Sequence, residues 1–342
     1  MKRSYRPVGQ GNFAVELFDE KTVVFDCGSK PVQSVISQID LVFQQDEVID
    51  IVYLSHLDYD HCSGVDYLIS RCDVKRIIIP YLDNQSRLLS RLTLFIENWN
   101  MSQLQFLDIV LSSERQNDTI NIFQKSIEIT YIEVFDSESS LSISYMNKNG
   151  YRIISGWVKW IIIPFNFRNS QRAIQFQNEI SKDYQLSSLT VDNLPQKWPL
   201  IKDKLIDIYK NKITGDINTN SMVIYSGPKS KNFHFNYRYS PGALFTGDYD
   251  TLSSFKRREL LNAINDYIPN IGYVTVPHHG SKLSNDALFI ERFNSIFIIQ
   301  SGKINQHNHP DYEVLLILGY LQKHTLIINE LSKPYDVGVF WI

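Results

Sequence analysis

The chain has 342 residues, of which 43% are hydrophobic and 13% aromatic, so it has ample material for a hydrophobic core. Its formal charge of −3 lacks the excess of basic residues that non-specific nucleic-acid binding requires. No apolar run approaches the roughly 20 residues that a membrane span needs, and MKRSYRPVGQ lacks an apolar signal region. Three cysteines, odd in number and without zinc-finger spacing, fit a reducing compartment. We therefore expect a cytoplasmic protein with no membrane association.

The N-terminal part reads as strands over 12–18 and 21–27, joined by an acidic turn. Another strand, over 50–54, ends abruptly in a polar cluster, a helix is expected from Gly64 onward, and a buried strand follows over 76–79. A strand, a polar loop and a helix in this order are typical of a site at the carboxyl end of a strand.

Residues 81–215 are richer in Gln, Asn and Ser, with a strand expected over 126–135, a hairpin around 147–150 and a possible helix cap at Ser170. The apolar spacing of residues 200–209 predicts a helix. No cluster of ionisable groups stands out here, so packing and surface roles are favoured over a second active site.

Regular alternation returns after residue 220. Strands are expected over 222–225, 233–239, 243–245 and 273–276, and a helix over 252–266. The C-terminal part alternates helix (285–293), strand (295–300), helix (311–323) and strand (325–329), with a last strand over 336–341. Helices spread along both ends of a strand-rich chain favour sheets covered by helices on their outer faces.

The loop VYLSHLDYDHCSG contains four groups of the kind that bind metals: His56, Asp58, Asp60 and His61. On an extended backbone the first three point the same way, and His61 reaches the same centre from the turn into the helix. Imidazoles with carboxylates suit Zn²⁺, Mn²⁺ or Fe. The alternative is a solvated polar loop. Cys62 beside these residues is interpreted as a small packed residue rather than a ligand or nucleophile.

Two further strand ends carry ligands of the same kind. Asp248 lies in FTGD, and His278 and His279 lie in VPHHGS, each directly after an apolar strand. Three strand ends that each deliver metal-type ligands predict a single site gathered from distant parts of the chain.

This set of motifs resembles the metallo-β-lactamase-fold hydrolases, and in particular the branch with the hydrolase domain of ComEC-type competence proteins. Other short stretches agree with that branch: Val8-Gly9-Gln10-Gly11, Asp26-Cys27-Gly28, Asn220-Ser221-Met222-Val223, and His309-Pro310 followed by Glu313-Val314-Leu315. The resemblance implies an α/β fold, a four-layer αββα sandwich with an inserted subdomain. The hydrolase core would comprise residues 1–80 and 216–342, and the insertion, of mixed strands and helices, residues 81–215.

Carried over by position, the resemblance implies that one or two divalent ions are held by His56, Asp58, Asp60, His61, Asp248 and His279. Zinc is favoured and manganese is the alternative. His56 and Asp58 would serve one metal position, and Asp60, His61 and one of His278 and His279 the other, with Asp248 between them. His279 is preferred as the ligand, and His278 as a contact to the transition state. Asp26 would brace the ligand loop.

The chain departs from the wider fold family at two points. Asp58 stands where most members have a histidine, and the histidine ahead of the bridging aspartate is absent unless His234 takes its place. His234 lies well after Ser221 in a strand pattern, so it is interpreted as a strand residue. The ComEC-like branch shares both departures, so they do not indicate a dead enzyme.

The motifs favour a metal-dependent hydrolase that cleaves phosphodiesters, and so a nucleic-acid substrate, with a metal-activated water as nucleophile. The catalytic residues would be Asp60 and Asp248, which hold the nucleophile, and His278 or His309, which contacts the developing anion or protonates the leaving group. The alternatives are hydrolysis of a non-nucleotide ester, lactone or amide, a structural metal site, and a vestigial site in an interaction protein. In the last case a protein partner would bind through residues 81–215.

Overall fold

The computed structural model describes residues 1–97, 99, 104–112, 119–132, 141–145, 158–167, 171–213, 221–229, 239–303 and 305–338. The hairpin expected around 147–150, the helix cap at Ser170, most of the strand over 233–239, and Asn220 and His234 lie outside these residues.

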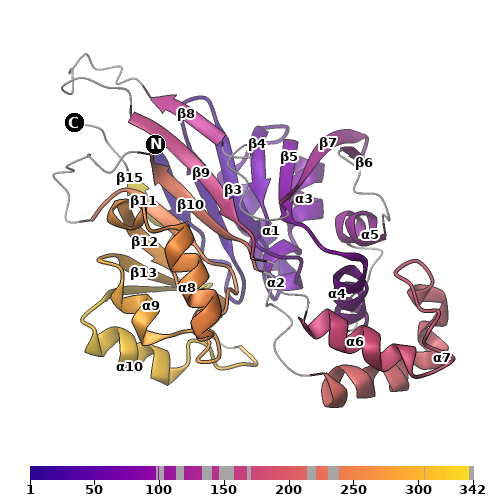
Figure 1. Cartoon of the computed structure of the whole chain (residues 1–342). Helices are drawn as coiled ribbons and strands as arrows, with labels where there is room; N and C mark the ends of the chain where they lie inside the picture. Colours follow the sequence, from indigo (N-terminus) through magenta and orange to yellow (C-terminus); the bar gives the residue numbers. More distant parts are fainter. Residues whose placement is uncertain are drawn as a thin grey trace.

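The first sheet has eight described strands in the order β15-β1-β2-β3-β4-β5-β7-β6 (Figure 1). Its central strands β3, β4, β5 and β7 are parallel, whereas the remaining pairs are antiparallel. The strands are β1 (Lys2–Tyr5), β2 (Phe13–Leu17), β3 (Thr22–Cys27), β4 (Val48–Tyr53), β5 (Asp73–Pro80), β6 (Thr119–Ile122), β7 (Lys125–Ile132) and β15 (Tyr335–Gly338).

The second sheet has seven described strands in the order β14-β13-β12-β11-β10-β9-β8. Strands β11 to β14 are parallel, and β8, β9, β10 and β11 pair antiparallel. The strands are β8 (Leu141–Tyr145), β9 (Val158–Phe165), β10 (Val223–Pro228), β11 (Gly242–Phe245), β12 (Ile271–Thr275), β13 (Ile296–Gln300) and β14 (His324–Ile328).

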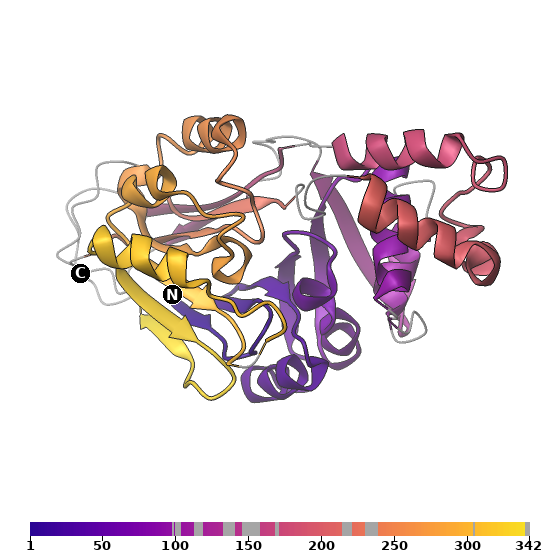
Figure 2. The same ribbon diagram turned by 90° about the horizontal axis from the view of Figure 1, so that it is seen from below.

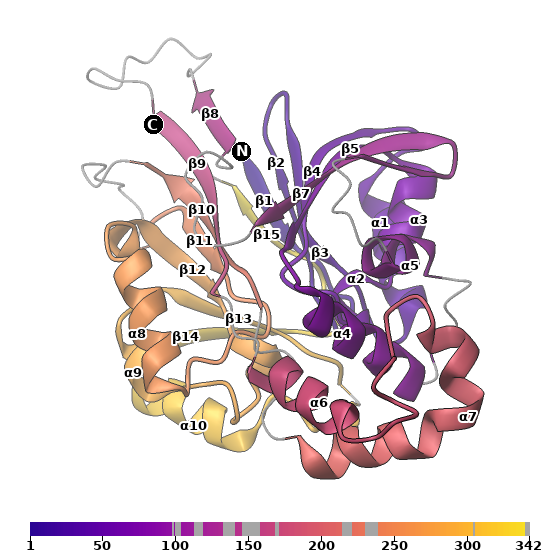
Figure 3. The same cartoon turned by 45° about the vertical axis from the view of Figure 1, so that its right-hand side comes forward.

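The two sheets face each other across a core that includes Tyr53, Trp160, Ile224 and Phe245. A second core lies between the first sheet and helices within residues 32–71 and 105–112, and a third between the second sheet and helices within residues 254–320. The layers are therefore helix, sheet, sheet, helix, as Figures 1 and 3 show. The predicted four-layer αββα architecture is confirmed.

The helices of these layers are short. They are α1 (Val32–Val42), α2 (Tyr59–Cys62), α3 (Val65–Arg71), α5 (Gln105–Ser112), α8 (Ser254–Ala263), α9 (Ala287–Glu291) and α10 (Tyr312–Tyr320), with 3₁₀ turns at Ile268–Asn270 and Pro277–Gly280. Helices α1 and α5 were not predicted from the sequence. The other helices of these layers begin within about five residues of an expected helix or, for α2, within the loop VYLSHLDYDHCSG.

Residues 81–215 divide between the sheets and a separate helical part. Strands β6 and β7 extend the first sheet, and β8 and β9 extend the second, so these strands belong to the sandwich. Helices α4 (Asn84–Ile96), α6 (Gln171–Ser181) and α7 (Leu194–Asp207), with the π turn Ile208–Lys212, pack around their own core. Figure 2 shows this helical part beside the sandwich. We therefore propose that the inserted unit is α4, α6 and α7 rather than all of 81–215.

Within the described residues, no helix combines the length and apolarity required to cross a membrane.

Candidate metal centre

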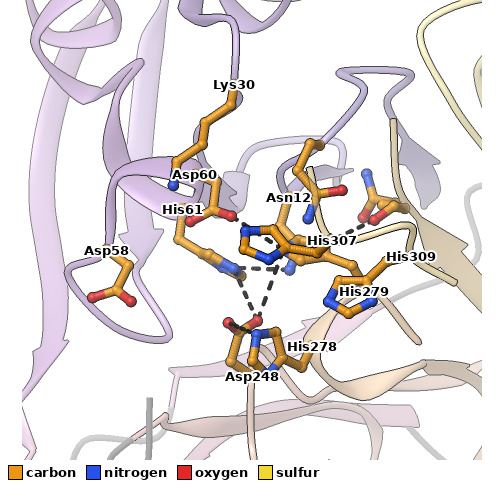
Figure 4. A network of polar contacts seen from close by, with 12 residues as sticks. Asn12, Lys30, Asp58, Asp60, His61, Asp248, His278, His279, His307 and His309 are labelled. Atoms are coloured by element: carbon orange, nitrogen blue, oxygen red, sulfur yellow. Dashed lines mark hydrogen bonds and ion pairs between the residues drawn. The ribbon is translucent and has the colours of Figure 1, made fainter. Parts of the chain in front are cut away.

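The site lies where the carboxyl ends of parallel strands from both sheets meet. Asp26 is near the end of β3, and the loop after β4 carries His56 and runs into α2, which contains Asp60 and His61. From the second sheet, Asp248 follows β11, and the turn after β12 carries the two adjacent histidines. Figure 4 shows the two groups facing each other.

Tight backbone packing places the ligand loop. A Cβ on Gly28 would lie 2.5 Å from backbone atoms of Asp60, His61 and Cys62, and one on Gly11 would lie 2.2 Å from the Gly28 carbonyl oxygen. The Asn12 N–H also donates to the Asp60 carbonyl oxygen at 3.1 Å. Only glycine at these two positions allows the three segments to approach so closely.

Asp26 holds the ligand loop from behind. Its carboxylate accepts from the Ser55 N–H at 2.7 Å and the Ser55 hydroxyl at 2.9 Å, and it lies 2.9 Å from His61 Nδ1. The residue is buried and has a φ of 52°. A non-glycine residue in this left-handed region is strained, and strain of this kind concentrates at functional sites.

Each of three histidines has its Nδ1 within hydrogen-bond distance of a polar partner. Asp26 accepts from His61, and the Gln300 carbonyl oxygen accepts from His279 at 2.8 Å. Ser55 Oγ, whose own proton goes to Asp26, lies 3.0 Å from His56 Nδ1, and Ser221 Oγ lies at the same distance. The Nε2 atoms of His61 and His279 are therefore the ones that carry a lone pair when these rings are neutral.

The Nε2 atoms of all three rings point at the same carboxylates. His61 Nε2 lies 3.1 Å and His56 Nε2 3.6 Å from Asp248, and His279 Nε2 lies 3.5 Å from Asp60. All three atoms are buried and make no hydrogen bond of ordinary geometry with the described residues. Buried polar atoms are rarely left without a hydrogen bond. Imidazole nitrogens that converge with carboxylate oxygens are the ligands that a divalent cation requires.

Two groups of ligand atoms lie within 4.8 Å of one another: His56, His61 and Asp248 in one, and Asp60, His61 and His279 in the other. The donor set of imidazole nitrogen and carboxylate oxygen fits Zn²⁺ or Mn²⁺. The arrangement provides for one or two divalent ions, with His61 common to both groups.

Asp58 lies at the margin of this arrangement. Its carboxylate is 3.8 Å from His56 Nε2 and outside both groups, and Figure 4 shows it apart from Asp60 and Asp248. Burial raises the pKa of Asp58 well above its usual range, and the charges of Asp60 and Asp248 add to this. A bound cation would offset that repulsion and favour the carboxylate.

The other two carboxylates are held ionised. Burial opposes their ionisation, but contact with His279 and the charges of His61 and Lys30 lower the pKa of Asp60. The charges of His278, His61 and His56 lower the pKa of Asp248 well below its usual range, also against burial. Burial together with the charge of His61 lowers the pKa of His56 to about 4.

The two adjacent histidines have different surroundings. The side chain of His279 is 1% exposed and belongs to a ligand group, whereas that of His278 is 19% exposed, with Nε2 3.5 Å from Asp248 and Nδ1 3.0 Å from Ser284 Oγ. Both have positive φ, near 50°, which turns the two rings into the site from consecutive positions. His278 therefore faces the site from a more accessible side.

His309 lies near the site but in neither ligand group. Its ring centroid is 5.7 Å from that of His278, and its Nδ1 is 3.6 Å from Asp311. Burial lowers the pKa of His309 to about 4, assisted by the charges of His278 and His279. The ring is therefore neutral near pH 7.

Sequence reasoning did not single out several groups that shape the site. The Gln300 carbonyl sets the tautomer of His279, and Ser55 Oγ lies 3.0 Å from His56 Nδ1. Ser221 Oγ accepts from the Asp248 N–H at 2.9 Å and also lies 3.0 Å from His56 Nδ1, although the sequence had marked Ser221 only as part of a matching stretch. Gln300 is the last residue of β13, and nothing in the sequence indicated Lys30.

Comparison with known proteins agrees with the fold. Residues 6–89 match the sequence profile of the metallo-beta-lactamase superfamily, and this match together with the two-sheet architecture supports that superfamily. No curated protein matches the chain. The ComEC-like resemblance is not separately confirmed.

Three solved structures illustrate the similarity. The short form of human tRNase Z is 8% identical over 100% of both chains, with a TM-score of 0.41. The metallo-beta-lactamase fold protein YhfI from Bacillus subtilis is 10% identical over 98% of this chain and 99% of its own, at 0.40. A diphosphatase from the PhnP family is 9% identical over 99% and 98%, at 0.42. Similarity at this level assigns no substrate.

Proposed function

We propose that this protein is a metal-dependent hydrolase of the metallo-β-lactamase superfamily that cleaves phosphodiester bonds. The observation that carries the proposal is the convergence of three Nε2 atoms on the ionised carboxylates of Asp60 and Asp248, with the tautomers of His61 and His279 set by acceptors at Nδ1. Structural metal sites usually have four cysteine or histidine ligands, whereas this one is rich in carboxylates.

The residues proposed to hold the metal are His56, His61, His279, Asp60 and Asp248, with Asp58 as a marginal ligand of the first position. When bound, a divalent ion supplies Lewis acidity and makes a water a stronger nucleophile near neutral pH. The preference for His279 over His278 rests on its burial and its place in a ligand group.

The protein groups around the attacked phosphorus divide the remaining work. Asp60 and Asp248, both ionised, accept hydrogen bonds from the attacking water and orient it. The water oxygen bonds to phosphorus and the bond to the leaving oxygen breaks. One proton of the water ends on the leaving oxygen and the other is released.

His278 and His309 are proposed to contact the phosphoryl or leaving oxygen. Ser284 orients the more accessible ring of His278, so that its Nε2 faces the site. The lowered pKa of His309 means that the neutral ring donates a hydrogen bond but does not deliver a proton near pH 7. The sequence had left both roles open for His309.

Lys30 supplies the reason to favour an anionic substrate. Burial opposes its charge, but the charges of Asp60, Glu97 and Asp58 raise the pKa of Lys30, so the ammonium group stays protonated beside the site. It lies 3.4 Å from Glu97 and 5.5 Å from the Trp99 ring centroid, with a side chain 34% exposed.

The proposal is tested with wild type and Asp60→Ala, in Mn²⁺ or Zn²⁺, on single- and double-stranded DNA, RNA and bis(p-nitrophenyl) phosphate. Loss of a ligand should lower turnover of the cleaved substrate by at least about 100-fold. The matched control is Asp46→Ala, an exposed carboxylate in the turn before β4, which should leave the rate unchanged. Equal rates for wild type and Asp60→Ala on every substrate would exclude phosphodiester hydrolysis at this site.

The substrate charge is tested with Lys30→Met. This variant should raise KM for bis(p-nitrophenyl) phosphate and leave KM for the neutral ester p-nitrophenyl acetate unchanged. Activity of the wild type on the ester alone would favour the non-nucleotide alternative. Absence of bound metal and of any activity would favour an interaction protein with a vestigial site.

A further inference from the structure

A cavity of about 120 Å³, with a lining of polar and apolar groups, lies in the helical part, and none of its lining residues belongs to the ligand groups. Its walls come from the first turns of α4, from α6 and from the segment before α7, which lie together in Figure 3. On the same measure one water needs only roughly 15 Å³, so the cavity holds a group of several heavy atoms.

Arg87 is the charged residue buried in this wall. It is 8% exposed, and its Nε is buried without a hydrogen-bond partner among the described residues. The one hydrogen bond from its guanidinium within the described chain goes to the neutral side chain of Asn84. None of the carboxylates described lies within ion-pair distance of it.

Arg91, one turn later on the same helix, also has a buried Nε without a hydrogen-bond partner among the described residues, but its charge is paired. It is 5% exposed and pairs with Asp108, and it also donates to Ser112 Oγ and to the Val191 carbonyl oxygen, both at 2.9 Å. The two arginines occupy similar depths, and only Arg91 has its charge balanced by a carboxylate of the described chain.

A buried charge without a counter-charge is strongly unfavourable unless something compensates it. The other groups at the cavity are suited to an anion: the side-chain amides of Gln85 and Gln177 and the hydroxyl of Thr190 can all donate hydrogen bonds. Asp192 also lines the cavity, but it is exposed and therefore screened by solvent.

The N-terminus of α4 adds little by itself. Asp83 already caps this helix by accepting from the Ser86 N–H at 2.7 Å, so part of its positive end is neutralised. The case for a ligand therefore depends on Arg87 and the cavity, and the helix end only adds to it.

We infer that this cavity binds a small tetrahedral oxyanion, phosphate or a phosphate group, with Arg87 as its charged anchor. The planar guanidinium can donate two parallel hydrogen bonds to such an anion. Arg87 also lines a smaller cavity together with Leu57, which lies between His56 and Asp58. An anion held there would join α4 and α6 to each other and stiffen the support of the ligand loop.

Thermal unfolding of the full, metal-loaded chain tests this with inorganic phosphate as the probe. Phosphate at about 100 times its dissociation constant should raise the wild-type Tm by roughly 4 °C. Arg87→Gln should lose this response. In phosphate-free buffer Arg87→Gln should melt at or above the wild-type temperature, because it removes an unbalanced charge.

The controls separate this site from the metal centre. If phosphate acts at the metal centre, Asp60→Ala would lose the response and Arg87→Gln would keep it, which would overturn the inference. A lower Tm for Arg87→Gln in both buffers, with the phosphate response intact, would also overturn it by making Arg87 purely structural.

A second variant keeps the test usable if Arg87→Gln fails to fold. Gln177→Leu changes the opposite wall and should weaken phosphate binding several-fold, and an unchanged dissociation constant would count against the site. A 5′-phosphorylated tetranucleotide and its unphosphorylated form identify the source of the anion. A shift with the phosphorylated form alone supports a phosphate group of a nucleic acid, and a shift with inorganic phosphate alone supports the free ion.

Discussion

Asp26→Asn should weaken metal binding although residue 26 is not a ligand. One oxygen remains in the variant and can still accept from the Ser55 N–H, which in the wild type donates at 2.7 Å. The new amide NH₂ then replaces the oxygen that lies 2.9 Å from His61 Nδ1. Because an amide nitrogen only donates, His61 Nδ1 must accept, and the imidazole proton moves to Nε2, which faces Asp248 at 3.1 Å.

The expected loss of metal affinity is about 10- to 100-fold, equivalent to roughly 1.4–2.7 kcal/mol, which is the usual cost of removing a partner that orients a metal-binding histidine. Asparagine accepts the left-handed backbone at this position at least as well as aspartate, so the fold should be retained.

The assay is competition with a chromogenic chelator, for Zn²⁺ and Mn²⁺, on wild type and Asp26→Asn. Asp50→Asn is the matched control, because Asp50 also accepts from a backbone N–H, that of Thr22 at 2.9 Å, at the opposite end of β4. Affinity within twofold of wild type for a folded Asp26→Asn protein would refute the tautomer argument.

Three further changes test the scaffold. Gly28→Ala should displace the ligand loop, because the new Cβ would lie 2.5 Å from the backbone of that loop. It should lower the metal content and lower the free energy of unfolding by about 1–3 kcal/mol. Normal metal content would contradict this. Glu16→Gln should destabilise the chain by about 3–5 kcal/mol in urea titrations, because it leaves the fully buried guanidinium of Arg3 without its carboxylate; a loss below about 1 kcal/mol would contradict it. Burial raises the pKa of Asp66 to about 6, although the hydrogen bond from the Phe106 N–H acts in the opposite direction. The protonated Asp66 side chain therefore contributes stability at low pH, and this contribution is lost as pH rises through 6. Asp66→Asn should therefore gain about 2 kcal/mol relative to wild type between pH 4 and 7, and parallel pH curves would contradict the assignment.

The part of the fold predicted best from the sequence was the part with regular periodicity. Strands β12 and β13 and helix α10 lie within a few residues of the expected positions because apolar runs and their polar ends mark them clearly. The strand order and the pairing of the two sheets depend on contacts between distant segments, which local patterns do not contain.

Helix α4 shows why the middle of the chain was harder to predict. Its sequence, NQSRLLSRLTLFI, has polar residues on most turns, and four of them are buried in the structure: Ser86, Arg87, Arg91 and Thr93. A buried arginine breaks the usual apolar pattern of an inward face. The cap at Asp83, which accepts from Ser86 N–H, was the signal available at its start.

For the candidate site, the three strand-end motifs indicated which residues would come together. The structure places five of the six proposed ligands in two compact groups and leaves Asp58 at the margin. Side-chain and backbone acceptors behind the ligands, such as Ser55 and the Gln300 carbonyl, could not be read from the sequence. A backbone carbonyl has no residue-type signature, and only the folded geometry shows which ring it orients.

The most direct test of the metal centre is anomalous diffraction from crystals of the full chain grown with Zn²⁺ or Mn²⁺. Anomalous density should lie next to Nε2 of His61 and of His279, bordered by the carboxylates of Asp60 and Asp248. Density elsewhere, or none at this position in crystals that contain the metal, would contradict the assignment of this site as a metal centre.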